Sequence, residues 1–206
     1  MEFQDVINKR KMIRSFENKP ISKEKVQRLI KNYFKGPSAG FSQGIELLVL
    51  DQGNDIQDFF STFGTPEERQ RSPWKLQEQG RLVLIPLAHK QTYLDRYAEK
   101  DKGWTDKSED RWPVPFWITD TAFASMIALL TVVNEGLGAV FVGVSNEQYV
   151  RERFYIPADY KPIGALIIGY SAPNDPPSPS LRRGHRSKKQ VTHFGKFGKH
   201  FSTYDL

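Results

Sequence analysis

The run from 121 to 134, TAFASMIALLTVVN, is the longest stretch without a charged residue, and it restricts the fold more than any other feature. A helix built from it is apolar on nearly every side, and such a helix must be buried in a core or an interface. The run is shorter than the ~20 residues that span a membrane. We therefore expect a buried helix over 121–135, with Asp120 as its N-cap and Gly136 just beyond its end.

Four apolar runs predict the strands of one sheet. They lie at 45–50, 82–87, 139–144 and 163–170. Each is short and is bounded by turn or helix signals, which is typical of buried strands. Because helix-like segments separate the runs, the sequence predicts an α+β domain around one central sheet.

Capping signals place further helices between these strands. Ser22 precedes a segment with an apolar stripe at helical spacing. Thr65 starts a capping box with Glu68, and we expect this helix to run toward Gln79. Asn146 is the N-cap of a short helix that ends near Phe154. A further short helix is expected over residues 3–9.

Two segments do not show a regular pattern. Residues 88–118 mix charges with Tyr93, Trp104, Trp112 and other aromatics. Long irregular segments are typical of lids or disordered insertions, and so many aromatics argue against disorder. Residues 171–180, SAPNDPPSPS, predict an extended arm.

The positive charge is concentrated after this arm. The chain has 206 residues and a net charge of +6, yet residues 182–199 contain seven Lys or Arg residues and no acid. The rest is therefore nearly neutral. The basic stretch could bind nucleic acid, hold a small phosphate, or be a solvated tail. Cysteine is absent, which excludes disulfides and thiolate chemistry, and the N-terminus has no signal-peptide pattern. A soluble, cytoplasmic protein is expected.

The loop GPSAGFSQG, residues 36–44, is longer and richer in small residues than a plain turn requires. Small residues let a ligand approach the backbone. The alternative is a simple connection in which Gly36 follows the end of a helix.

Four segments resemble motifs of the FMN-dependent nitroreductase superfamily. RKMIRSFENKPI (10–21) resembles its "RRSxRxF…xPI", PSAGFSQG its "PSxxNxQPW", NEGLGAVFVGV (134–144) its "xxLGLGxxWIG", and IPADYKPIGALIIGY (156–170) its "IPxxxxPxxxxxxGxP". They occur in the same order and cover most of the chain. The loop is also similar to that of flavin-cleaving dimethylbenzimidazole synthases, "PSVGFxQPW", which suggests a divergent branch.

The resemblance implies a central mixed sheet flanked by helices, in a domain-entwined homodimer with FMN at the interface. Residues 1–170 would form the flavin-binding domain, with 88–118 as an aromatic lid or insertion. Residues 171–206 would be a basic arm that completes the same domain. The most plausible interface helix is 121–135. NAD(P)H would be the electron donor, and no side chain need be catalytic because the flavin N5 accepts and donates the hydride.

The resemblance also implies the residues of the site. The flavin-binding residues would be Arg10, Lys11, Met12, Arg14, Pro37, Ser38, Ala39, Gly40, Phe41, Gln43, Val142, Gly143, Arg182, Arg183 and Arg186. The residues around the substrate would be Phe41, Trp104, Trp112, Phe116 and Trp117.

Some members of this set have an expected role. Arg10 is assigned to the flavin phosphate and Arg14 to the pyrimidine edge of the ring. At least one of the arm arginines is expected to bind the phosphate as well. Met12 replaces a serine, and Phe41 stands where many members have an asparagine.

Each assignment has a structural alternative. Arg10 and Arg14 could be surface cations, and Gly143 could be a β-bulge glycine. Core packing would explain Phe116 and Trp117 as well as a substrate pocket does.

The predicted function is an FMN-dependent oxidoreductase that passes hydride from NAD(P)H to a flat acceptor such as a nitroaromatic or quinone. Its partners would be a second copy of the chain and a small-molecule acceptor, with no membrane. One alternative is a flavin enzyme of another type, such as oxygen-dependent flavin fragmentation or reductive dehalogenation. A non-catalytic flavin- or nucleotide-binding protein is another. Binding of nucleic acid by the basic arm is a further alternative.

Overall fold

The structure is a computed structural model that describes residues 1–72 and 80–200. The chain divides into two compact units, Met1–Pro176 and Pro177–Leu206, which are described separately. The sequence placed the change from domain to arm at residue 171. The proposal that the arm completes the domain remains a prediction.

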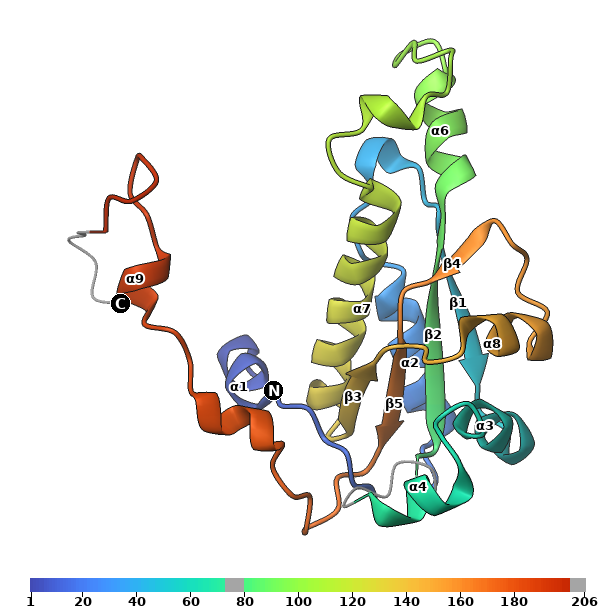
Figure 1. The fold of residues 1–206 in the computed structure, drawn as a ribbon, viewed down its shortest axis with the longest axis vertical. Helices are drawn as coiled ribbons and strands as arrows, with labels where there is room; N and C mark the ends of the chain where they lie inside the picture. The colour runs from blue at the N-terminus through green and yellow to red at the C-terminus, as the bar shows by residue number, and fades with distance from the viewer. Residues whose placement is uncertain (73–79, 201–206) are drawn as a thin grey trace. The chain divides into compact units, whose positions relative to one another are not determined.

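The first unit is built around one sheet. Its strands are β1 (Ile45–Leu50), β2 (Leu82–His89), β3 (Gly138–Val142), β4 (Tyr160–Pro162) and β5 (Ala165–Gly169), in the order β1-β2-β5-β3 with β4 also paired to β2 (Figure 1). Every ladder between these strands is antiparallel. In the described residues, parallel pairing is limited to one bridge, between Met12 and Ala139. The α+β class is thus confirmed.

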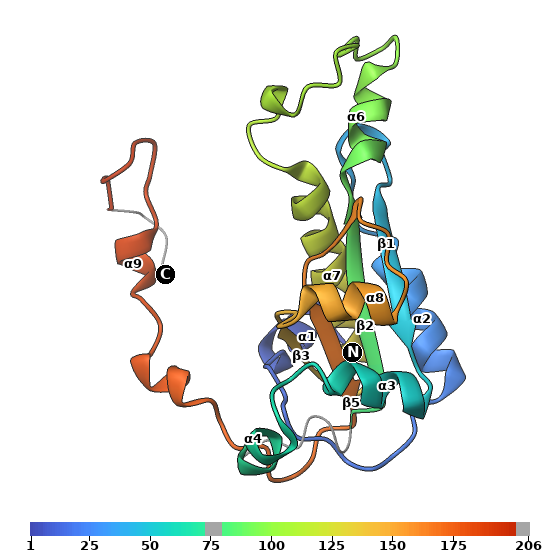
Figure 2. The ribbon, with the colours of Figure 1, turned by 45° about the vertical axis from the view of Figure 1, so that its right-hand side comes forward.

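Helices cover both faces of the sheet. They are α1 (Phe3–Lys9), α2 (Lys23–Tyr33), α3 (Gly53–Phe60), α4 (Pro66–Arg71), α6 (Lys90–Ala98), α7 (Phe116–Asn134) and α8 (Glu147–Arg153), with short 3₁₀ turns η1 (Ala39–Phe41) and η2 (Glu109–Arg111). Helices α2 and α7 lie on one face of the sheet and α3 and α8 on the other (Figure 2). Their buried side chains form two separate cores. Within β2, Val83 and Ile85 belong to one core and Leu82 and Leu84 to the other. This alternation explains why β2 is a continuous apolar run.

Several local predictions are confirmed. The Thr65 N–H donates to Glu68 Oε2 at 2.8 Å, and the Glu68 N–H donates to Thr65 Oγ1 at 3.2 Å. Asn146 Oδ1 accepts from the Tyr149 N–H at 3.1 Å at the start of α8. The helix expected toward Gln79 is described as α4 to Arg71. The prediction for 73–79 lies outside the described residues. Ser22 precedes α2 but its side chain makes no capping hydrogen bond.

The predicted start of α7 is wrong. The helix begins at Phe116, and Asp120 lies inside it rather than at its N-cap. The predicted end is confirmed: Gly136 has φ 71°, and the Leu137 N–H donates to the Val132 carbonyl at 2.9 Å. This is the hydrogen bond of a glycine-terminated helix.

The expected irregularity of 88–118 is also partly wrong. The first residues extend β2 to His89, and α6 follows at once over Lys90–Ala98. The final predicted strand is divided into β4 and β5 at Gly164, whose backbone has φ 155°. A Cβ there would lie 2.3 Å from the Phe141 ring, so only glycine fits without a shift.

Helix α7 is long and apolar enough to cross a membrane, with 19 residues and a mean hydropathy of 1.7. Half of the span is buried inside the protein, as in the core helix of a soluble protein. One such helix is weak evidence for a membrane protein.

Candidate functional site

The N-terminal strip, residues 10–16, lies along β3. The Ile13 N–H donates to the Ala139 carbonyl at 2.8 Å, and Phe16 forms a bridge with Ser171. Ile13 and Phe16 are buried, whereas Arg10, Met12 and Arg14 are half-buried and Lys11 is exposed. The strip is therefore fixed by its backbone and by the buried side chains of Ile13 and Phe16, and its cations are half-buried or exposed.

The cations of the strip differ in their contacts. The backbone N–H of Arg14 donates to Asp175 Oδ1 at 2.9 Å, and its guanidinium donates to the Met12 carbonyl at 3.4 Å. Arg10 makes no ion pair with any residue within 1–72 or 80–200. A half-buried guanidinium of this kind is suited to bind an anion.

The end of β3 offers open backbone near the strip. Val142 is the last residue of the ladder and pairs with Ala165. Gly143 follows it and is exposed, and a Cβ at this position would meet nothing within 4 Å. Because the β3–β5 register is regular up to Val142, Gly143 lies beyond the ladder rather than at a bulge within it.

The glycine loop, residues 36–44, has a strained backbone. Gly40, Phe41 and Gln43 have φ values of 61°, 57° and 61°. This left-handed region is uncommon for residues with a Cβ, and such strain often marks functional sites. Pro37 and Gln43 are exposed, and Phe41 is 76% exposed. The loop thus presents one aromatic ring and one amide side chain outward.

The loop is more than a plain connection after α2. That helix ends at Tyr33 with Phe34 as its C-cap, so Gly36 is not the terminating glycine. A Cβ on Gly36 would lie 3.0 Å from the Cβ of Ala124 in α7. Glycine is therefore used here for a close approach between loop and helix.

Hydrogen bonds fix the loop from within and from α6 and α7. Ser38 Oγ accepts from the Gln43 N–H at 3.0 Å. The Ala39 N–H donates to Asp120 Oδ2 at 2.8 Å, and the Gly40 carbonyl accepts from Arg96 Nε at 2.9 Å. The Ser38 hydroxyl, expected to reach the flavin, is thus engaged inside the loop.

Four of the five predicted substrate aromatics, Trp104, Trp112, Phe116 and Trp117, form an aromatic cluster beside the loop. Tyr93 and Tyr97, which were not predicted, belong to the same cluster, whereas Phe41 does not. Trp112 is central, with ring centroids 4.4 Å from Tyr97 and 5.8 Å from both Phe116 and Trp117. Trp117 is buried with Tyr93, and burial raises the pKa of the Tyr93 hydroxyl. The described part of the chain gives Trp112 Nε1 no hydrogen-bond partner.

The structure does not bring the strip and the loop together within one protomer. Ala39 is bonded to Asp120 near the start of α7, while Ile13 is bonded to Ala139, just beyond the end of the same helix. From Asp120 to Asn134 the helix rises by roughly 21 Å. The two groups of predicted flavin residues therefore lie at opposite ends of α7 (Figure 1).

The remaining predicted residues belong to the second unit. Arg182 and Arg183 end a 3₁₀ turn, η3 (Pro179–Arg183), and Arg186 precedes a short helix, α9 (Lys188–Val191). All three arginines are exposed. Their predicted role at the flavin phosphate remains a prediction.

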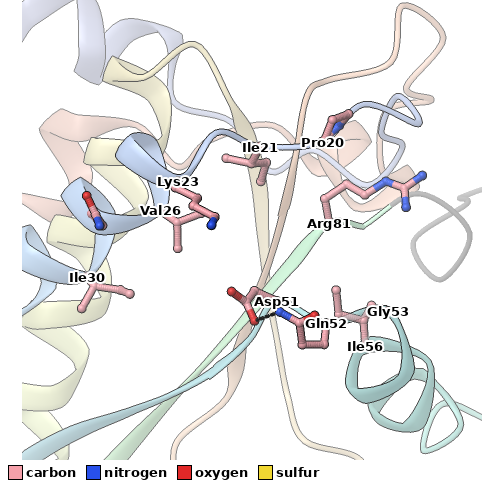
Figure 3. Close-up of a pocket in the computed structure, with 11 residues that line it drawn as sticks. Pro20, Ile21, Lys23, Val26, Ile30, Asp51, Gln52, Gly53, Ile56 and Arg81 are labelled. Carbon is pink, nitrogen blue, oxygen red and sulfur yellow. Dashed lines mark hydrogen bonds between the residues drawn. The ribbon is translucent and has the colours of Figure 1, made fainter.

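Another pocket lies elsewhere in the first unit. Its volume is about 560 Å³, and it is lined by residues of α2 and α3, by Asp51 after β1, and by Arg81 before β2 (Figure 3). None of the predicted flavin or substrate residues lines it. It is thus separate from both the strip and the loop.

Three residues that fix the loop were not predicted as part of the site: Tyr93, Arg96 and Asp120. A signal was present for Asp120, because it is an acid directly before an uncharged helical run. We interpreted it as a local cap. Its partner Ala39 is distant in the sequence, so the sequence offers no direct sign of the contact.

Comparison with known proteins identifies the family. The sequence profile of the nitroreductase family matches residues 7–170. The chain belongs to the nitroreductase family. The match spans the strip, the loop and the strands β1 to β5, so the resemblance seen in four short motifs is confirmed.

Relatives of known name are oxidoreductases. A protein of Methanothermobacter thermautotrophicus, provisionally named NADH dehydrogenase/NAD(P)H nitroreductase, is 24% identical over 84% of this chain and 80% of its own length. A Staphylococcus aureus NADPH-dependent oxidoreductase is 22% identical over 83% of this chain. The match covers 65% of that relative's length. A general oxidoreductase role follows for the present chain.

Solved structures share the fold. The FMN-dependent nitroreductase of Clostridium difficile R20291 has a TM-score of 0.65 and 21% identity, with 93% of this chain and 98% of that chain covered. A nitroreductase family protein of Clostridium difficile 630 has a TM-score of 0.70 and 19% identity, with 95% and 99% covered. At these identities the likeness establishes the fold alone.

Proposed function

We propose that the protein is an FMN-dependent oxidoreductase that passes hydride from NAD(P)H to a flat acceptor such as a nitroaromatic or quinone. Membership of the nitroreductase family over residues 7–170 is the observation on which this rests. The donor is proposed from the NAD(P)H and NADPH in the names of two relatives. FMN is proposed from the name of a structural neighbour and from the residues themselves.

The residues fit FMN. A phosphate needs cations, and Arg10 is half-buried with no ion pair in the described residues, beside exposed Lys11. A planar ring needs open backbone, which Gly143 provides. Met12 replaces a polar residue with a soft apolar one that packs against both cores, so it supports the strip rather than the phosphate.

Each group has a defined task in this proposal. Arg10 and Lys11 bind the phosphate, and Arg14 stabilises the negative charge that develops at the pyrimidine edge of the flavin. The backbone of the glycine loop and of Val142–Gly143 orients the ring. Phe41 covers the acceptor, and the aromatic cluster excludes water beside it. Bound FMN would supply reversible hydride transfer, so no acidic or basic side chain is required.

We propose further that the working form is a homodimer. The strip and the loop are at opposite ends of α7, so one site that uses both requires a second copy of the chain. An apolar surface suits this contact: Phe3 and Ile7 of α1 and Phe123 and Met126 of α7 are exposed. A shallow pocket of about 380 Å³ lies between α1 and α7, lined by Phe3, Ile127 and Leu130 among others. In the dimer the strip of one protomer would meet the loop of its partner.

The arm and the compartment belong to the same proposal. Arg182, Arg183 or Arg186 would add a further cation to the phosphate. The protein would act in the cytoplasm. Deletion of residues 182–206 would lower flavin occupancy if the arm binds FMN, and would abolish salt-sensitive binding of nucleic acid if that alternative holds.

The first experiment is a visible absorption spectrum of the purified protein after incubation with FMN and gel filtration. We expect a retained flavin that NADH or NADPH bleaches. Retained flavin that neither nucleotide reduces would favour a binding or fragmentation role. No retained flavin would overturn the proposal. Arg10→Ala should weaken retention, whereas Arg153→Ala, which removes an arginine of α8 that is paired with Asp58 of α3, should not.

The dimer is tested by sedimentation. Phe123→Asp introduces a charge into the exposed face of α7 and should yield monomers that have lost FMN. Tyr155→Asp is a matched control, because Tyr155 is an exposed aromatic outside the proposed interface, with a φ of 53° that Asp tolerates. Dimers that persist in Phe123→Asp would contradict the proposed interface.

A further inference from the structure

Asp120 is a buried acid at an unusual position. It lies inside α7 and is 3% exposed. Its Oδ2 accepts two hydrogen bonds, one from the Ala39 N–H at 2.8 Å and one from the Tyr93 hydroxyl at 2.9 Å. A carboxylate is buried only where such bonds satisfy it. One oxygen atom thus joins α7, α6 and the glycine loop.

Arg96 makes a second contact with the next residue of the loop. Its Nε donates to the Gly40 carbonyl at 2.9 Å. Its other two nitrogens donate to Asp101 at 2.7 and 2.8 Å, so the guanidinium plane is fixed from the opposite side. The loop is held at consecutive residues, by an acid at Ala39 and by an arginine at Gly40.

Ring packing leaves the loop little freedom between these bonds. A Cβ on Gly40 would lie 2.6 Å from the Tyr97 ring, and a Cβ on Gly44 would lie 2.6 Å from the Tyr93 ring. Both tyrosines belong to α6. The same helix therefore supplies the rings beneath the loop, one partner of Asp120, and Arg96.

These contacts explain how the strained residues of the loop persist. Phe41 directly follows the held pair, Gln43 comes two residues later, and both adopt left-handed backbone conformations. Such conformations persist only when the surrounding structure enforces them. The direction in which Phe41 and Gln43 point is thus set by bonds to Ala39 and Gly40.

We propose that Asp120 is a positioning residue for the flavin. Together with Tyr93 and Arg96 it fixes the backbone of the glycine loop in the one conformation that fits the isoalloxazine ring. This inference rests on the proposed function. It also gives residues 90–98 a role other than that of a lid, because α6 packs against the loop and bonds to it through Arg96.

The test compares two buried polar residues of α7. Asp120→Ala removes the bond to Ala39. Ser125→Ala is the matched control, because Ser125 is also 3% exposed but its hydroxyl donates only to the Thr121 carbonyl of the same helix. We expect Asp120→Ala to weaken FMN binding about tenfold or more, the effect of losing a charge-assisted hydrogen bond. Ser125→Ala should change the Kd less than twofold.

In a second pair of variants, each substitution removes one oxygen atom. This pair tests the inference even if Asp120→Ala fails to fold. Tyr93→Phe deletes a hydroxyl that donates to Asp120. Tyr33→Phe deletes a hydroxyl that donates to the Glu46 carbonyl of β1, outside the loop, and both tyrosines are fully buried. The visible circular dichroism of bound FMN reports how the ring is held. We expect Tyr93→Phe to change it and Tyr33→Phe to leave it as in the wild type.

Hydrogen exchange separates this inference from the proposed function. Without any flavin, the amides of residues 37–44 should exchange faster in Asp120→Ala than in Ser125→Ala. Equal exchange would overturn the positioning role, and so would equal flavin affinity and dichroism in both pairs. A wild-type protein that binds no FMN would overturn the proposed function, while the exchange comparison would still decide whether Asp120 fixes the loop.

Discussion

The two ends of α7 are fixed by different kinds of contact. At its C-terminal end, Gly136 adopts a left-handed conformation and the backbone closes on itself between Leu137 and Val132. At its N-terminal end, Asp120 bonds to a residue in a loop that precedes the whole of β1 and β2. The C-terminal end is thus closed by its own backbone, with Arg28 of α2 paired to the adjoining Glu135, whereas the N-terminal end bonds through a side chain of the helix to the backbone of a distant loop. The N-terminal end is the one beside the glycine loop, whose conformation the proposed flavin site requires.

The largest effect should come from Asp120→Ala. The substitution leaves the Ala39 N–H and the Tyr93 hydroxyl without their acceptor. Each unsatisfied group costs about 1–3 kcal/mol, so we expect the free energy of unfolding to fall by about 2–6 kcal/mol. Urea unfolding measures this. A loss no larger than that of Ser125→Ala would show that the N-terminal end does not depend on the long-range contact.

The C-terminal end should respond to Gly136→Ala. A Cβ in the left-handed conformation costs about 1–2 kcal/mol, although space around Gly136 is open. The loss should appear in urea unfolding, while exchange at residues 37–44 stays unchanged. Faster exchange in the loop would mean that the two ends are coupled through the helix.

A separate local cap provides a reference for this comparison. Asn146→Ala removes the side-chain acceptor for the Tyr149 N–H at the start of α8. We expect a loss of about 1 kcal/mol, detected by urea unfolding, with flavin binding unchanged. An effect on flavin binding would place α8 closer to the site than the structure does.

The smallest effect should come from Glu135 at the C-terminal end. Its hydrogen bonds and charge pairing with Arg28 lower the pKa of the Glu135 carboxyl. Because the folded pKa is depressed, the stabilisation is present above the unfolded value of about 4.5 and is lost as pH falls through the folded pKa. Glu135→Gln should therefore be slightly less stable than the wild type at pH 7 and equal to it at low pH. If Glu135→Gln remains less stable than the wild type at low pH, the loss of stability comes from packing rather than from charge.

The parts of the fold that could be predicted are those whose signals are local. β1 was predicted with its observed bounds because five of its six residues are apolar and the run ends at a turn. The capping box at Thr65 and the cap at Asn146 follow from side chains that bond within three residues. The end of α7 could be predicted from a single residue, Gly136.

The errors have the opposite character. Asp120 is a good N-cap in isolation, and only the loop that bonds to it shows that the helix starts earlier. Helix α6 was missed because its buried residues, Tyr93 and Leu94, are adjacent in the sequence and form no clear stripe among the charges around them. The division of the last strand depends on the ring of Phe141 beside Gly164.

The candidate site shows the same contrast. Residues of the strip and of the glycine loop could be chosen from the sequence because they form motifs. Their separation along α7 could not be foreseen, because it depends on how the sheet is ordered. The residues that hold the loop were absent from the predicted set for the same reason.

The close approach of Gly36 to Ala124 makes position 36 useful for protein engineering. A methyl group there would meet the helix backbone at 3.0 Å, a contact that a shift of a few tenths of an ångström relieves. Alanine and serine at position 36 would thus displace the loop by small, graded steps from a point remote from Phe41. A library at this one position could alter acceptor selectivity without replacing any residue proposed to touch the cofactor.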